Sequence, residues 1–141
     1  MEQTKTVITV SAKVNAPVQR VWEYWTKPEH ITQWNAASPD WHAPRAKNDL
    51  RTGGKFTCRM EARDGSMGFD FGGTYVEVRD HAYIEYNMDD GRNVKISFTP
   101  VNGATEVVES FEAEQINSID LQRTGWQAIL DNFKKYTENG N

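Results

Sequence analysis

The residue types that perform nucleophilic chemistry occur in this sequence without the neighbours that would activate them. Cys58, the only cysteine, alternates with polar residues in a predicted strand, where a cysteine behaves as a small hydrophobic side chain. A nucleophilic thiol needs a neighbouring base, and nothing in the sequence indicates one. Gly53-Gly54-Lys55 is not a phosphate loop, because that motif has four residues between its glycines and a Ser or Thr after the lysine, where Phe56 stands here. The sequence therefore predicts no nucleophilic catalysis, and the glycines are typical of a turn that enters a strand.

The three histidines, His30, His42 and His81, form no recognisable metal motif. No two of them have the zinc-protease spacing, and no Cys/His cluster accompanies them. We therefore expect neither a metal nor a cofactor. His42 stands beside Trp41 in a predicted loop, and two interpretations of it stay open: an exposed loop histidine, or a polar group at the mouth of a cavity.

One carboxylate, Glu109, is predicted to lie on an apolar face. It shares strand parity with Val107 and Phe111, so its side chain points to the same side of the strand as theirs. A buried carboxylate needs a partner or acquires a raised pKa, and such a group orients a ligand or acts as a general base. A place near a strand end, or beyond a bulge that reverses the side chain, stays open as the alternative.

The elements that position these residues follow from the apolar pattern. Alternation over residues 5–14 predicts a half-buried strand, and two short helices follow, separated by Pro28, with the second over residues 29–34. Residues 35–45 hold two prolines and are predicted to form a loop. From residue 46 the period becomes two, and a bulge or bend is predicted at Gly72-Gly73. Tight turns are predicted at Asp64-Gly65, Asp90-Gly91 and Asn102-Gly103.

The order of these elements predicts an α+β fold. Sequential hairpins make an antiparallel meander with one solvent-exposed face and one apolar face. A long amphipathic helix at the C-terminus can cover the apolar face. We therefore expect a curved antiparallel sheet of about six to seven strands wrapped around a long C-terminal helix, with two short helices between the first and second strands.

The predicted C-terminal helix contains a glycine that needs an explanation. Its apolar face is formed by Leu121, Gly125, Ala128, Ile129, Phe133 and Tyr136. A glycine inside a helix costs roughly 1 kcal/mol relative to alanine. Either another backbone approaches Gly125 closely, or the helix leaves room there for a ligand. On the second hypothesis, Gly125→Leu fills a cavity and blocks binding without unfolding the protein.

The composition restricts the class of protein. The chain has 141 residues, 38% hydrophobic and 11% aromatic, and a net charge of -4. This charge argues against nucleic-acid binding, and no apolar run approaches the roughly 20 residues of a membrane span. The single cysteine and an N-terminus without signal-peptide order indicate a cytoplasmic protein. Within twenty residues lie four tryptophans that are predicted to cap a core or wall a cavity: Trp22, Trp25, Trp34 and Trp41.

Motifs along the whole chain occur in the order of a known superfamily. They are Ala16-Pro17 with Val21-Trp22, Pro28 and Trp34, Asn48 to Phe56, Gly73 to Val78, Asp90-Gly91-Arg92, and Gly125-Trp126 with Ile129-Leu130 and Phe133. The chain thereby resembles the START-like, or SRPBCC, superfamily with its helix-grip fold, and more narrowly the branch named after the activator of the ninety-kilodalton heat-shock chaperone ATPase. The resemblance implies a single START-like domain over residues 1–141, with a cavity between the sheet and the C-terminal helix. It does not specify chemistry, because the superfamily includes lipid and hormone carriers, polyketide cyclases, aromatases and co-chaperone domains.

We predict that this cavity binds a hydrophobic small molecule, aromatic or lipid-like. Two alternatives stay open: a cyclase- or aromatase-like enzyme in which a cavity carboxylate or histidine moves protons, and a co-chaperone-like domain that binds a protein through an exposed apolar patch. No nucleic-acid or membrane partner is predicted. The candidate ligand-binding residues are Trp34, Trp41, His42, Phe56, Cys58, Met60, Phe71, Tyr86, Met88, Phe98, Glu109, Phe111, Gly125, Trp126 and Ile129.

Overall fold

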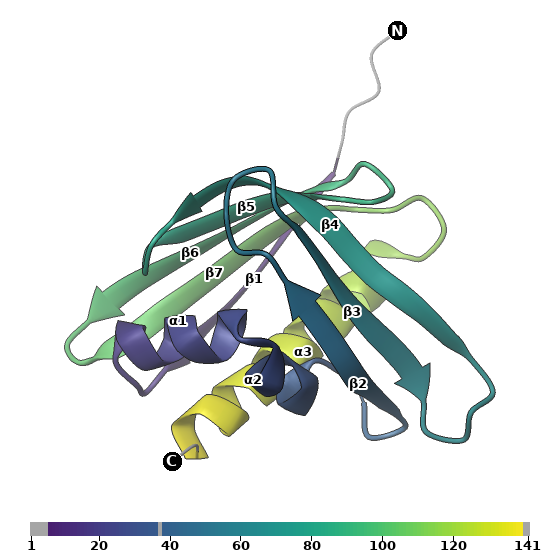
Figure 1. Cartoon of the computed structure of the whole chain (residues 1–141), viewed down its shortest axis with the longest axis horizontal. Coiled ribbons are helices and arrows are strands. Elements are labelled where there is room, and N and C mark those ends of the chain that lie inside the picture. Colours follow the sequence, from purple (N-terminus) through teal and green to yellow (C-terminus); the bar gives the residue numbers. More distant parts are fainter. Residues whose placement is uncertain (1–5, 37, 140–141) are drawn as a thin grey trace, which may run out of the picture.

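A curved sheet partly encloses one long helix (Figure 1). The computed structural model describes residues 6–36 and 38–139. In chain order the elements are β1 (Val7–Val14), α1 (Val18–Thr26), α2 (Pro28–Trp34), β2 (Trp41–Asn48), β3 (Lys55–Ala62), β4 (Gly68–Arg79), β5 (Tyr83–Met88), β6 (Asn93–Val101), β7 (Ala104–Glu112) and α3 (Ile119–Asn139). Within these residues, seven strands pair antiparallel in the order β1-β7-β6-β5-β4-β3-β2. The predicted fold class is confirmed, with α3 crossing the concave side of the sheet and α1 and α2 beside it (Figure 1).

Alternation of side chains builds the apolar face of the sheet as the sequence predicts. In β3, Cys58 and Met60 are buried and the residue between them is partly exposed. The predicted tight turns are confirmed by positive φ angles, 79° at Gly65, 96° at Gly91 and 83° at Gly103. Glycine adopts such angles without steric cost, which allows the hairpins to close.

The predicted loop over residues 35–45 is wrong at its C-terminal end, because strand β2 begins at Trp41 and contains Pro44. β2 lies at the edge of the sheet and pairs only with β3. The missing N–H of Pro44 therefore interrupts no second ladder. The register also shifts between His42 and Arg45, which accommodates the proline.

The bulge predicted at Gly72-Gly73 is wrong in position. Both glycines stay in register with β3, and the irregularity of β4 falls between Tyr75 and Glu77 on the side of β5. Close approach of the neighbouring backbone explains the glycine instead, because a Cβ on Gly72 would lie 2.7 Å from the carbonyl oxygen of Phe56.

The buried face of α3 differs from the predicted one. Leu121 is 60% exposed, whereas Gln122 is 7% exposed. The buried positions of the helix are Gln122, Leu130, Phe133 and Thr137. This stripe is rotated by roughly one residue from the predicted face. Gly125 is only partly buried, and a Cβ there would meet no atom within 4 Å beyond its own helix and chain neighbours, which excludes a close backbone approach.

Three of the four clustered tryptophans fix the short helices to the rest of the core. Trp22 and Trp25 pack edge-to-face on Phe98, with ring centroids 5.3 and 5.7 Å apart. Trp25 and Trp34 pack in the same way on Phe133 of α3, at 4.8 and 4.9 Å. These contacts close the interior on the side of α1 and α2. None of the helices in the described part of the chain is long and apolar enough to span a bilayer.

Candidate ligand-binding cavity

A cavity of about 350 Å³ lies between the sheet and the helices. Strands β2 to β7 and all three helices contribute to its wall, which is mostly apolar. From α3, only Trp126 and Ile129 reach it. The two side chains leave part of the concave face of the sheet uncovered, and this uncovered part is the cavity.

Ten of the fifteen predicted site residues line this cavity. They are Trp34, Phe56, Cys58, Met60, Phe71, Tyr86, Met88, Glu109, Trp126 and Ile129. Most lie on strands, where side chains on one face recur at every second residue. Strand parity in the sequence was therefore sufficient to place the strand residues of this set on one face of the sheet.

The other five predicted residues lie elsewhere. Trp41 and His42 line a separate hollow of about 340 Å³. Phe98 packs against the tryptophans of α1. Phe111 stacks on Trp126, with ring centroids 3.8 Å apart, and so supports the wall from behind. Gly125 adjoins open space but does not line the cavity.

Sequence reasoning missed a set of polar wall residues. The Tyr75 hydroxyl donates to the Asn48 side-chain oxygen at 2.6 Å, and Asn48 Nδ2 donates to the Thr26 carbonyl at 2.6 Å. Tyr75 shares strand parity with Phe71, so the sequence contained a signal that places Tyr75 on the same face as the predicted site residues. Asn48 is the last residue of β2, a strand whose first half was predicted as a loop because of Pro39 and Pro44. No sequence signal placed Asn48 in the wall.

The environment of Cys58 lowers the reactivity of its thiol. Burial raises the pKa of its thiol to about 11, and a hydrogen bond from Asn35 Nδ2 to Sγ at 3.3 Å only partly opposes this. The thiol therefore stays protonated at neutral pH, and a protonated thiol is a poor nucleophile.

Glu109 lies in the middle of β7, opposite Val10 of β1 and Ile96 of β6, with 6% of its surface exposed. Burial alone raises the pKa of its carboxyl to about 8. No hydrogen bond or ion pair to this carboxyl is found among the described residues, so nothing there offsets the cost of burying its charge. Glu109 is therefore a protonated, unpartnered carboxyl group on the cavity wall at neutral pH.

Tyr86 lies near Glu109, on β5. Its ring packs edge-to-face on Phe56 at 4.7 Å and on Phe71 at 6.5 Å, and 6% of the residue is exposed. Burial raises the pKa of its hydroxyl well above 10, the charge of Glu109 raises it further, and Arg92 lowers it. The hydroxyl is therefore within electrostatic reach of both Glu109 and Arg92.

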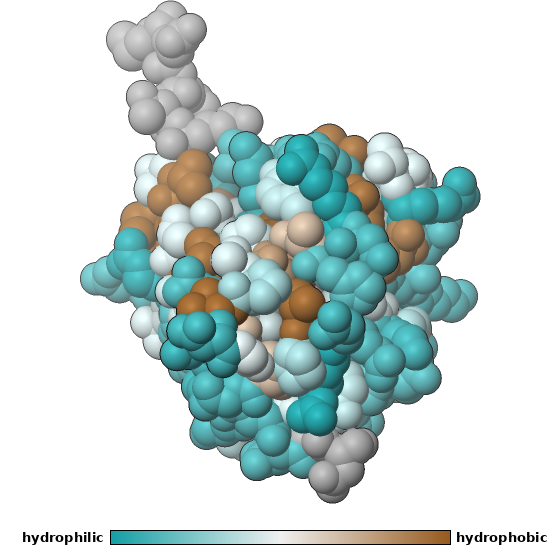
Figure 2. Space-filling model, turned by 90° about the vertical axis from the view of Figure 1, so that its left-hand side faces the viewer, coloured by the Kyte–Doolittle hydropathy of each residue, from teal (hydrophilic) through white to brown (hydrophobic). Residues whose placement is uncertain are grey.

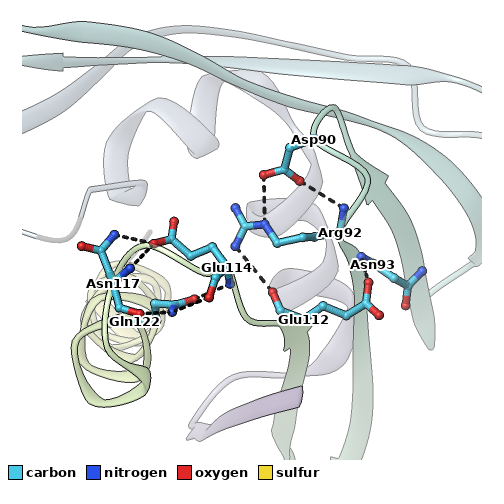
Figure 3. Close-up of polar contacts among 7 residues, drawn as sticks. All are labelled: Asp90, Arg92, Asn93, Glu112, Glu114, Asn117 and Gln122. Atoms are coloured by element: carbon cyan, nitrogen blue, oxygen red, sulfur yellow. Dashed lines mark hydrogen bonds and ion pairs between the residues drawn. The ribbon is translucent and has the colours of Figure 1, made fainter. Parts of the chain in front are cut away.

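Arg92 lines the cavity where the turn between β5 and β6 approaches the end of β7 (Figure 3). Its Nε donates to the carboxylate of Asp90 at 2.9 Å, and its Nη1 donates to the backbone carbonyl of Glu112 at 3.5 Å. The guanidinium group is therefore partnered at the wall rather than extended into the cavity.

Glu114 lines the cavity from the segment between β7 and α3. Its carboxylate accepts from the backbone N–H of Asn117 at 2.9 Å. Gln122 holds the same segment, because its Oε1 accepts from the Glu114 N–H and its Nε2 donates to the Asn117 carbonyl, both at 2.9 Å (Figure 3). The buried glutamine thus fixes the chain that enters α3.

The remaining histidines lie outside the cavity wall. His30 Nδ1 shares a 2.6 Å hydrogen bond with the Tyr136 hydroxyl, and its ring stacks on Tyr24 at 4.0 Å. His81 Nδ1 is 3.0 Å from the carboxylate of Asp80. In the described part of the chain, no three His, Cys, Asp or Glu side chains are grouped so as to hold a metal ion.

Residues 15–138 match the sequence model of the family described as "Activator of Hsp90 ATPase homolog 1-like protein". The chain belongs to this family. It is 54% identical to a protein of Cytophaga hutchinsonii (TM-score 0.81) and 44% identical to an AHSA1-like protein of Aeromonas hydrophila (TM-score 0.89), and each match covers 94% of this chain and 92% of the other. A protein of Chromobacterium violaceum shares the fold at 20% identity, with a TM-score of 0.82 over 96% of this chain and 99% of that one. No curated protein matches the chain at significant similarity. The predicted family is thus confirmed.

Proposed function

We propose that this protein acts in the cytoplasm and binds a hydrophobic, ring-bearing small molecule in the cavity between the sheet and α3. One observation carries the proposal: a cavity of about 350 Å³, walled by aromatic rings, contains a buried carboxyl group without a partner among the described residues. Small-molecule sites typically combine an apolar concavity with a few converging polar groups. The volume is at the lower end of the usual range, which favours compact ring systems over long-chain lipids.

The free energy needed for binding requires both the apolar and the polar residues of the wall. Removing roughly 200 Å² of ligand apolar surface from water contributes about 5 kcal/mol at 25 cal/mol per Å². A micromolar complex needs about 8 kcal/mol. Ring contacts with Phe56, Phe71 and Trp126, and hydrogen bonds to the buried polar groups, are the sources of the remaining ~3 kcal/mol.

Thermal unfolding with 2-acetylnaphthalene, flavone and decanoic acid tests the proposal. A ligand at a hundred times its dissociation constant adds about 2.7 kcal/mol of stability. We expect this stabilisation from the two ring compounds and less from the fatty acid. Failure of both ring compounds to shift the unfolding temperature would contradict the proposal.

Two substitutions on α3 locate the binding site. Ile129→Trp replaces an aliphatic side chain on the cavity wall with a bulky indole ring and is expected to abolish the stabilisation. Gly125→Leu, one turn away and outside the cavity wall, is the matched control and is expected to retain it. Because overpacking costs about 1–3 kcal/mol, the unfolding temperature without ligand shows whether each variant is folded. Retained binding in folded Ile129→Trp, or equal loss in both folded variants, would contradict a site at this part of the wall.

A second candidate function is a cyclase- or aromatase-like enzyme, favoured by one observation. A carboxyl group whose pKa is raised to about 8 can exchange a proton with a bound substrate near neutral pH. In this case Glu109→Gln would retain ligand binding and abolish turnover of the ligand. Identical product formation by the wild type and this variant would exclude the role.

A co-chaperone-like role has less support from the surface. On the face shown in Figure 2, hydrophobic side chains are scattered in small groups among hydrophilic ones. Protein-binding sites more often present a contiguous apolar patch of several hundred Å². Stimulation of a chaperone ATPase by the purified protein is the direct test.

A further inference from the structure

Two buried side chains on the cavity wall have a hydrogen-bonding group without a partner among the described residues: Glu109 on β7, with its carboxyl, and Tyr86 on β5, with its hydroxyl. Each residue is 6% exposed. Only β6 separates their strands, and the charge of Glu109 raises the pKa of Tyr86, so the two groups act on each other across the same space. A ligand that bonds to both groups would give each of them a partner inside the cavity.

The other buried polar groups of the wall are already partnered, and so is its arginine. The Tyr75 hydroxyl donates to Asn48, and Cys58 accepts from Asn35. Arg92 donates to a carboxylate outside the cavity. These groups therefore have less to gain from a ligand than Tyr86 and Glu109.

No charged side chain of the elements packed around Glu109 contributes to the raised pKa of its carboxyl. β1 and β6 place Val10 and Ile96 beside it, and α3 contributes only Trp126 and Ile129 to the wall. The charged groups elsewhere on the wall are Arg92, Glu114 and Lys47, and the titratable ones are Cys58, Tyr75 and Tyr86.

We propose that the cavity selects ring-bearing ligands that carry a carbonyl oxygen, and that this oxygen accepts hydrogen bonds from both Tyr86 and Glu109. The inference deepens the proposed function and rests on it. A carbonyl oxygen has two lone pairs and can accept two donors at once. A ketone, ester or amide attached to a flat ring system satisfies both the aromatic wall and the two buried donors.

A neutral acceptor fits this site better than a cationic ligand. Arg92 acts electrostatically on Tyr86, so a ligand cation placed beside this hydroxyl gains no attraction from the arginine. Burial raises the pKa of Glu109 to about 8, so its carboxyl carries a proton at pH 7 and donates it. A tyrosine hydroxyl and a protonated carboxyl can each donate one hydrogen bond, so a single acceptor oxygen between them can be bonded by both.

The test compares 2-acetylnaphthalene with 2-isopropenylnaphthalene, in which a methylene group replaces the carbonyl oxygen. Calorimetric titration at pH 7 is expected to show roughly tenfold tighter binding of the ketone, the effect of one to two neutral hydrogen bonds. Tyr86→Phe reduces this preference, and Glu109→Leu removes most of it. Glu109→Gln, which keeps an N–H donor, retains it.

The pH dependence provides an independent readout. Ketone affinity of the wild type is expected to be constant from pH 6 to about 7.5 and then to fall by up to tenfold per pH unit, as Glu109 loses the donated proton. Glutamine cannot ionise, so the affinity of Glu109→Gln stays constant over this range. A third ligand, (2-naphthylmethyl)trimethylammonium, would show the opposite trend in the wild type if the site were built for cations.

The possible outcomes distinguish failure of the carbonyl inference from failure of the proposed function. Equal affinity for the two naphthalenes with no pH dependence overturns the inference and leaves the proposed function intact. Preference for the ammonium compound, with affinity that rises toward pH 8, overturns it in favour of cation binding. If no naphthalene binds but flavone does, the inferred carbonyl is tested by the same pH titration with flavone. If no ring compound binds, both the inference and the proposed function fail.

Discussion

Replacing Glu109 by glutamine is expected to remove a large part of the pH dependence of stability. The carboxyl has a pKa of about 8 in the folded protein, against an ordinary value of 4.5 that we take for the unfolded chain. Between these values the folded protein holds a proton that the unfolded chain has released, so the free energy of unfolding falls as pH rises. The contribution is fully present below pH ~4.5 and is lost as pH rises through about 8.

The magnitude follows from the two pKa values. Each pH unit corresponds to about 1.4 kcal/mol, so the full effect is about 5 kcal/mol, and about 4 kcal/mol of it falls between pH 5 and pH 8. Glutamine resembles the protonated carboxyl in size and cannot ionise. The free energy of unfolding of Glu109→Gln minus that of the wild type is therefore expected to increase by about 1.4 kcal/mol per pH unit up to pH ~8, and then to level off.

Urea unfolding at pH 5, 6, 7, 8 and 9 measures this difference, because other titrating groups are the same in both proteins and cancel. Glu106→Gln, an exposed position on the same strand, is the matched control, and its curve is expected to run parallel to that of the wild type. A difference for Glu109→Gln that does not vary with pH would refute the reasoning. It would mean that the carboxyl has a partner or is solvated in the folded protein.

Three further predictions concern the described contacts. Gly125→Ala is expected to raise the free energy of unfolding by about 1 kcal/mol, since a Cβ there meets no neighbour within 4 Å and alanine favours helix; destabilisation in urea would contradict the geometry. Gln122→Leu is expected to lower it by about 1–3 kcal/mol and to speed amide exchange at Glu114, because buried backbone groups lose their partner. The exposed neighbour Leu121→Gln is its control, with an expected change below ~0.5 kcal/mol. Finally, with its thiol pKa at about 11, Cys58 is expected to react with a disulfide reagent at pH 8 at least a hundredfold more slowly than in the urea-unfolded chain, and equal rates would exclude the buried position.

The elements predicted best from the sequence are those in which local pattern and tertiary environment agree. β3 contains Cys58, as the alternation around that residue predicts, because this alternation matches a sheet with one covered face. Glu109 was placed on the apolar face by parity alone, and the structure puts it on the cavity wall. Parity succeeds here because β7 runs without a register shift between β1 and β6.

The elements that local pattern could not predict depend on neighbours distant in the sequence. Pro44 breaks the strand pattern, but an edge position tolerates it, and edge position is a property of the whole sheet. On α3, Leu121 is apolar and exposed while Gln122 is polar and buried, because the glutamine binds the segment that precedes the helix. The wall residues Arg92 and Asn48 were missed for the same reason, since turns and strand ends bring them to the cavity.

The most direct test of the central claim is to locate a bound ring by nuclear Overhauser effects to assigned methyl groups. Isoleucine and methionine methyls are suited to this, since some line the cavity and others do not. The methyls of Ile84, Ile96, Ile129 and Met88 line it, whereas Ile116 and Met67 are 90% and 65% exposed outside it. With saturating 2-acetylnaphthalene, we expect contacts from the ring protons to the first set and none to the second. Contacts confined to Ile116, Met67 or other exposed methyls would contradict a binding site between the sheet and α3.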